Sequence, residues 1–194
     1  MFAYCLNNPV NMADSDGRDA IVVVEYILDE NGLPIVGHIS VYIQDADGNW
    51  HFTEYTGVFP DKSTATVECR EATAEDMERI TKMLQGKYIK GKQYLHIEGD
   101  FSDSVDLAKS YDGSDFGGYV FVGNSCLDYI QEILSVASYE SPLVAAAVWV
   151  GADTTLAPYD YIAQLRRVSM ISKITKFVME VTCDVAKTLP FMWR

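Results

Sequence analysis

Apolar residues alternate with polar ones, or run without interruption, in several stretches of the first hundred residues. Residues 20–28 are almost entirely apolar and rich in valine, which is typical of a strand buried on both faces. Residues 37–44 and 50–57 alternate on either side of an Asp- and Gly-rich stretch, so they predict a β-hairpin. Shorter runs at 65–69 and 93–98 predict two further strands.

Elsewhere the apolar residues recur at helical intervals. Thr73 and Asp76 resemble a capping box ahead of one apolar stripe, and residues 102–110 predict a second, short helix. A third helix is predicted to begin at Cys126, with Asn124 or Ser125 as its cap.

The last third of the chain is also helical in pattern. Ser141 and Pro142 predict the start of an apolar helix that continues through Val150. One or two further helices are expected between about Thr155 and Lys187. The whole pattern predicts an α+β domain, in which a small antiparallel sheet packs on the helix that begins at Cys126 and additional helices follow.

Composition narrows the possible functions. A chain of 194 residues is long enough for one domain with a proper core, or for one domain and a short appendage. Its net charge of -13 disfavours a nucleic-acid partner, because binding to phosphates depends on clustered Lys and Arg. No apolar run approaches the ~20 residues of a membrane span, and no N-terminal signal peptide is recognisable.

The four cysteines are too sparse for a disulfide scaffold and have no metal-ligand spacing, so neither a metal nor a cofactor is expected. They are Cys5, Cys69, Cys126 and Cys183. Cys126 differs from the others because it is placed at a helix N-terminus, where backbone N–H groups and the helix dipole lower the pKa of a thiol. The alternative interpretation is that Cys126 packs as a small buried hydrophobic residue.

A cysteine nucleophile needs a histidine that can accept its proton. His38 is the best candidate, at the start of the first hairpin strand, whereas His51 and His96 are interpreted as ordinary strand residues. A third group should orient the imidazole: Glu54 is the first choice, because a carboxylate stabilises an imidazolium best, and His51 the second. The register of the turn at 45–49 decides which face of the second strand lies beside His38, and the pattern leaves that register open.

The first nineteen residues carry an ordered series of short motifs. Tyr4, residues 7–11 (Asn-Asn-Pro-Val-Asn) and residues 14–17 (Asp-Ser-Asp-Gly) resemble the closing motif of the Rhs repeat-associated core, with Ser15 where that family usually has proline. The resemblance implies that residues 1–19 are the tail of such a core and that residues 20–194 are a variable effector domain, often a toxin. It also implies export or delivery within a larger Rhs-type protein, and a cognate immunity protein as partner.

A second resemblance concerns the candidate site. The Gly37-His38 strand, its hairpin and the later Asn124-Ser125-Cys126 helix start are similar to circularly permuted papain-like families, such as NlpC-type amidases and relatives of lecithin:retinol acyltransferase. The resemblance implies that Cys126 is the nucleophile and His38 the general base. It also implies that the N–H of Cys126, assisted by Asn124, stabilises the oxyanion, although the family often has Asn directly before the cysteine.

The expected function is therefore that of a cysteine hydrolase or acyltransferase acting on an amide, ester or thioester. By resemblance, peptidoglycan peptides or proteins are the expected substrates. One alternative is a binding or adhesion module that has the papain-like shape without the chemistry. Acyl transfer on lipids is a third possibility, which depends on the apolar stretch at 143–150 being exposed beside the site.

Overall fold

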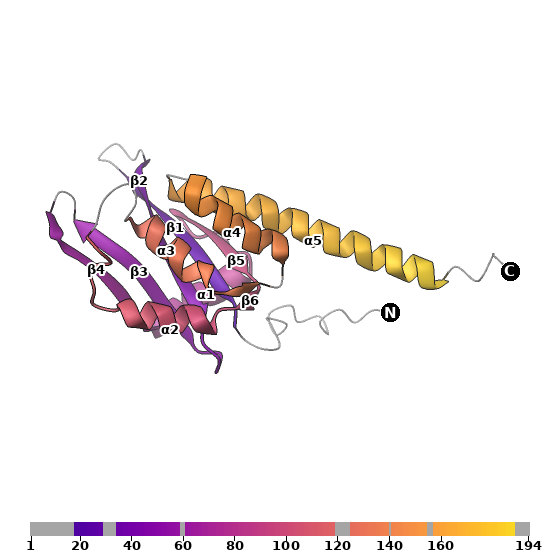
Figure 1. Cartoon of the computed structure of the whole chain (residues 1–194), viewed down its shortest axis with the longest axis horizontal. Coiled ribbons are helices and arrows are strands. Elements are labelled where there is room, and N and C mark those ends of the chain that lie inside the picture. The colour runs from indigo at the N-terminus through magenta and orange to yellow at the C-terminus, as the bar shows by residue number, and fades with distance from the viewer. Residues whose placement is uncertain are drawn as a thin grey trace.

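The computed structural model describes the backbone of residues 18–28, 34–58, 61–118, 125–139, 141–154 and 157–188. The motifs of residues 1–17 and the candidate residue Asn124 lie outside this part of the chain. Within it, the chain forms an α+β fold with a five-stranded antiparallel sheet and five helices, in agreement with the predicted class (Figure 1).

The sheet has the strand order β4-β3-β2-β1-β5 and is antiparallel throughout. A second, two-stranded sheet pairs β6 with β7. The strands are β1 (Ala20–Leu28), β2 (Pro34–Gln44), β3 (Trp50–Val58), β4 (Asp61–Glu71), β5 (Lys92–Ile97), β6 (Gly99–Asp100) and β7 (Ser138–Tyr139). The predicted strand at 65–69 is longer than expected, because the polar residues before it also pair with β3 at the sheet edge.

The helices are α1 (Ala74–Leu84), α2 (Ser102–Tyr111), α3 (Cys126–Ser135), α4 (Pro142–Thr154) and α5 (Pro158–Thr188). The main core lies between one face of the sheet and helices α2, α3, α4 and the first turns of α5 (Figure 1). Residues from alternate positions of β1 and β2 supply the sheet side of this core, among them Val22, Val24, Ile39 and Val41. Because β1 lies between β2 and β5, Ile21 and Val23 on its other face are buried as well, whereas Glu25 and Tyr26 near its end are partly exposed.

Helix α1 packs on the opposite face of the sheet. Ile80 and Met83 form a smaller core there with Tyr42 and Trp50 from the hairpin. Thr73 caps α1, and the reciprocal hydrogen bonds with Asp76 confirm the predicted capping box.

The C-terminal third is an α-helical pair. The apolar stretch of α4 is partly buried: Val144, Ala147 and Val148 contribute to the core, while Leu143 is exposed. Helix α5 is one helix rather than two, and it extends beyond the sheet and α4 (Figure 1). None of the helices in the described ranges has the length and hydropathy needed to cross a membrane.

Candidate functional site

The site begins with the first turn of α3. Ser125 is the N-cap, and its hydroxyl accepts a hydrogen bond from the N–H of Asp128, while the carboxylate of Asp128 accepts one from the N–H of Ser125 at 2.8 Å. This capping box fixes Cys126 as the first residue of the helix, where N–H groups lack partners within the helix. The positive end of the helix dipole favours a thiolate at this position, although the carboxylate of Asp128 offsets part of that effect.

His38 and Glu54 are brought together by the β2–β3 hairpin. Next to the turn, Gln44 is paired with Trp50. The same register continues along the two strands, so that Ser40 is paired with Glu54. The Nε2 atom of His38 lies 2.8 Å from the Oε2 atom of Glu54. The structure therefore places the first-choice orienting residue in direct contact with the imidazole.

Cys126 is a second hydrogen-bonding partner of His38. Burial would lower this pKa, but hydrogen bonding and charge interaction with Cys126 and with Glu54 raise it to about 10. Since Nε2 faces Glu54, Nδ1 is the ring nitrogen available to the thiol. A thiol, an imidazole and a carboxylate from α3, β2 and β3 thus form one hydrogen-bonded series.

The β2–β3 ladder ends just before His38, at the pair Ser40 and Glu54. Alternation along β2 places His38 in phase with Ser40 and Tyr42, facing away from the row of Ile39 and Val41 that packs under α3. Beyond Ser40, however, β3 continues beside β4, with Thr56 opposite Thr66. We infer that the imidazole reaches the start of α3 at this point, where β3 no longer flanks β2.

Exposure differs across the three side chains. Those of His38 and Glu54 are 22% and 21% exposed, whereas Cys126 is only 4% exposed and belongs to the main core cluster. His38 and Glu54 therefore form the part of the site that contacts solvent. Reagents can reach the sulfur only if the surroundings of the first turn of α3 open.

Two buried side chains that the sequence analysis did not single out anchor α3 to the sheet. The hydroxyl of Thr53 donates to the carbonyl oxygen of Glu68 at 2.8 Å, so the hydroxyl of Tyr129 donates in turn to Thr53 at 2.6 Å. Tyr129 lies one turn after Cys126, and Thr53 lies next to Glu54 in β3. Alternation along β3 and the helical period of α3 place both side chains toward the core. Such positions usually hold apolar residues, so the sequence pattern gave no indication that Thr53 and Tyr129 are joined by a hydrogen bond.

An aromatic cluster holds the loop after α2 against the same region. Phe116 packs edge-on against Tyr55, Tyr111 and Tyr129, with ring centroids 5.2–5.5 Å apart. Phe116 also has a backbone φ of 45°, which is uncommon for a residue other than glycine. Packing of the ring on three tyrosines stabilises this unfavourable conformation.

The other candidate groups lie elsewhere. His51 is buried on the other face of β3 and contacts Asp45 through Nε2 at 2.9 Å, so it is not the partner of His38 in this arrangement. Asp45 also accepts hydrogen bonds from the N–H groups of Asp47 and Asn49, as expected for a turn. Burial and the charge of Asp112 raise the pKa of Cys69 to about 11.

In chemical terms, the series can move a proton from a thiol to an imidazole that a carboxylate holds in place. Within the described ranges, no group of three or more His, Cys, Asp or Glu side chains is arranged to hold a metal ion. Comparison with known proteins found no matching family model, no matching curated protein and no matching solved structure.

Proposed function

We propose that this chain is a cysteine hydrolase or acyltransferase of the permuted papain-like type, with Cys126 as nucleophile and His38 as general base. The observation that carries the proposal is the contact of His38 with both Cys126 and Glu54, which raises its pKa to about 10. Because an imidazole with a raised pKa is protonated near neutral pH, it stabilises a thiolate at the start of α3.

In the proposed reaction, the Cys126 thiolate attacks the carbonyl carbon of an amide, ester or thioester. The carbon–nitrogen, carbon–oxygen or carbon–sulfur bond then breaks, and protonated His38 gives its proton to the leaving group. Water or an acceptor amine or alcohol next attacks the acyl-Cys126 intermediate, and His38 takes the proton of this second nucleophile. The bond between the acyl carbon and Sγ then breaks, which releases the product and regenerates the Cys126 thiolate. Backbone N–H groups in the first turn of α3 would stabilise the oxyanion in both steps.

Glu54 is a positioning residue in this scheme. A hydrogen bond donated by Nε2 of His38 to Glu54 holds the ring and leaves the lone pair of Nδ1 for the thiol proton. The carboxylate also stabilises the imidazolium form while the acyl-enzyme is formed.

The biological setting follows from the resemblance of the first nineteen residues to an Rhs-type core. We propose that residues 20–194 act as a toxin-like effector that a larger protein delivers to a target cell, and that a cognate immunity protein protects the producer. Peptides of peptidoglycan, or proteins of the target cell, are the proposed substrates. The lipid alternative has less support, because Val144, Ala147 and Val148 of the apolar stretch of α4 pack into the core, although Leu143 is exposed.

One observation favours a different class. Since Cys126 is only 4% exposed, a binding or adhesion module with a papain-like shape and a structural thiol is the second candidate. Labelling with iodoacetamide at neutral pH distinguishes the enzyme from the binding module. The extent of labelling at each cysteine is measured by peptide mass spectrometry. A thiolate at Cys126 should react at least tenfold faster than Cys69, whose pKa is about 11.

The direct test is expression of the chain in bacterial cells, in the cytoplasm and with an export signal, with growth as the readout. Cys126→Ala and His38→Ala are expected to abolish growth inhibition, while Cys69→Ala keeps it. Thermal unfolding of the purified variants shows whether they fold. Growth inhibition that survives in folded Cys126→Ala would rule out the proposed chemistry.

A further inference from the structure

Helix α5 has two apolar faces. Its first turns bury Tyr161, Ile162 and Leu165 completely against the domain. Nine residues after Leu165, Ile174 is 55% exposed. Because nine residues make about two and a half turns of an α-helix, these two side chains point in opposite directions.

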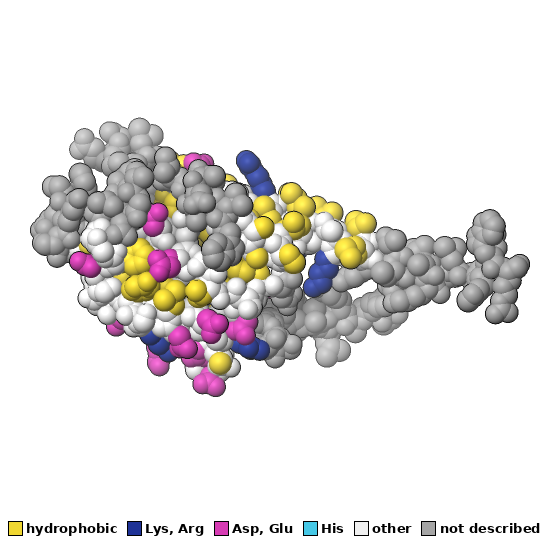
Figure 2. Space-filling view, viewed as in Figure 1, with side chains coloured by type: hydrophobic (Ala, Val, Ile, Leu, Met, Phe, Trp, Pro, Cys, Tyr) yellow, Lys and Arg dark blue, Asp and Glu magenta, His cyan; other side chains and the backbone are white. Residues whose placement is uncertain are grey.

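Ile174 is the centre of a continuous exposed strip. We define the outer stripe by five described residues that lie within about 60° of Ile174 around the helix, at about 100° per residue. They are Met170, Ile171, Ile174, Phe177 and Val178, and they are 52–65% exposed. Figure 2 shows hydrophobic side chains gathered along this part of α5, where the helix leaves the domain.

We propose that the outer stripe pairs with the same stripe of a second copy of this chain. Ile171, Ile174 and Val178 have the three-then-four spacing of a coiled-coil seam, and the sequence continues that spacing at Val181 and Val185. In a dimer with two-fold symmetry, the same surface of both copies meets itself and must therefore be self-complementary. An uncharged apolar stripe meets this requirement. This inference is independent of the proposed enzymatic function.

The nearby charges permit self-pairing. Lys173 and Lys176 are the charged residues between Met170 and Met179, and both line a groove that they share with residues of β5 and α4. Lys173 lies 3.4 Å from Glu98 in that groove. These two cations therefore lie on the domain side of α5, so the two stripes bring no like charges together between Met170 and Met179. Arg167, one heptad before Ile174, is exposed on the same face at the domain end of the stripe.

The available area reaches the lower limit for a specific dimer. Phe177 belongs to the aromatic class that buries roughly 150–250 Å² each, and we take roughly 150–200 Å² as the fully exposed area of each of the five residues, four of which are smaller or more slender. At the observed exposures, five side chains from each copy would remove about 800–1,200 Å² from water, before any contribution from neighbouring residues. Specific interfaces begin at about 1,000–1,200 Å², so we expect a dimer of moderate affinity.

The test is the mass of the whole chain in solution, measured by sedimentation equilibrium from about 1 to 200 µM, a range that brackets a micromolar Kd. The expected result is about twice the chain mass of 21.7 kDa at the upper end. Ile174→Glu should weaken association at least tenfold, because it places a charge in the middle of the seam. Circular dichroism confirms that the variant keeps its helices, and Phe177→Ser provides a second, milder change.

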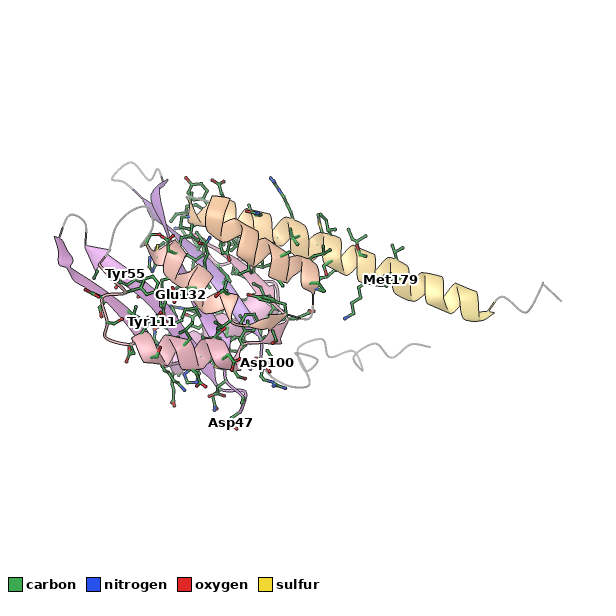
Figure 3. All side chains as sticks on the ribbon, in the orientation of Figure 1. Asp47, Tyr55, Asp100, Tyr111, Glu132 and Met179 are labelled. Carbon is green, nitrogen blue, oxygen red and sulfur yellow. The ribbon has the colours of Figure 1, made fainter. Side chains whose placement is uncertain are left out.

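Met179→Glu is the matched control. Met179, labelled in Figure 3, is 63% exposed and lies five residues after Ile174, about 140° around the helix and outside the outer stripe. It should leave the dimer intact. A monomer at every concentration, or equal effects of both substitutions, would overturn the proposal. Co-sedimentation of the monomer with phosphatidylglycerol vesicles, lost in Ile174→Glu, would assign the stripe to a lipid surface instead.

Discussion

Replacing Glu54 with glutamine keeps the shape of the side chain beside His38 and removes its charge. The carboxylate lies 2.8 Å from Nε2, and both side chains are only about a fifth exposed, so solvent screens the pair incompletely. An opposite charge at this range raises the pKa of a histidine by about one to three units. The contact with Cys126 remains, so the pKa of His38 should fall from about 10 to between about 7 and 9.

The same change has a calculable effect on stability. The pKa of His38 is raised in the folded state, so its contribution is fully present below the unfolded value of 6.5 and disappears as pH rises through about 10. One to three pKa units correspond to about 1.4–4 kcal/mol. We expect Glu54→Gln to lower the free energy of unfolding by this amount near pH 6 and by almost nothing near pH 11.

Proton NMR gives the first readout, because the chain has three histidines and their ring signals can be assigned by substitution. Urea unfolding at several pH values gives the second. Glu68→Gln is the matched control: Glu68 lies opposite Glu54 on β4 and pairs with Arg70 at 2.7 Å. If Glu54→Gln left the titration of His38 unchanged, or Glu68→Gln moved it equally, the charge interaction inferred at the site would be wrong.

Two further predictions concern capped helices and a buried carboxylate. Ser125→Ala and Thr73→Ala each remove a capping box, and each should lower the free energy of unfolding by about 1 kcal/mol. Only Ser125→Ala should speed the alkylation of Cys126, by about fivefold, because it allows the first turn of α3 to open. Equal alkylation rates in the two variants would refute this local effect. Burial would raise the pKa of Asp76, but hydrogen bonds from Arg70, Thr73 and Tyr42 hold it well below its usual range. Its contribution is present above about pH 4 and lost on acidification, so Asp76→Asn should cost about 1.5–3 kcal/mol in urea unfolding at pH 7 and much less at pH 2.

Local pattern was sufficient for most of the elements. The hairpin, the capping box of α1 and the start of α3 at Cys126 agree with the sequence-based expectations, because each depends on residues within a few positions of one another. The pairing of Ser40 with Glu54 required the conformation of the turn at 45–49, where Gly48 has a positive φ and Asp45 accepts from Asn49. Alternation alone gives the same faces for several registers.

Long-range features were less accessible. The contact of His38 with the start of α3 joins residues that are 88 positions apart, and no local motif marks it. The apolar pattern also predicted an amphipathic helix in the region of α5. It did not show that one apolar face would be buried against the domain and the other exposed. Which face of a helix is covered depends on elements distant in sequence, whose packing the helical period does not encode.

The division of the site along the chain has a consequence for folding. His38 and Glu54 are sixteen residues apart and belong to one hairpin, whereas Cys126 is 88 positions after His38. Contacts between residues close in sequence tend to form before distant ones, so a folding intermediate can hold the imidazole beside its carboxylate before Cys126 joins them. In a chain still emerging from the ribosome, His38 and Glu54 can therefore meet first, and the contact with Cys126 is completed only when α3 has docked.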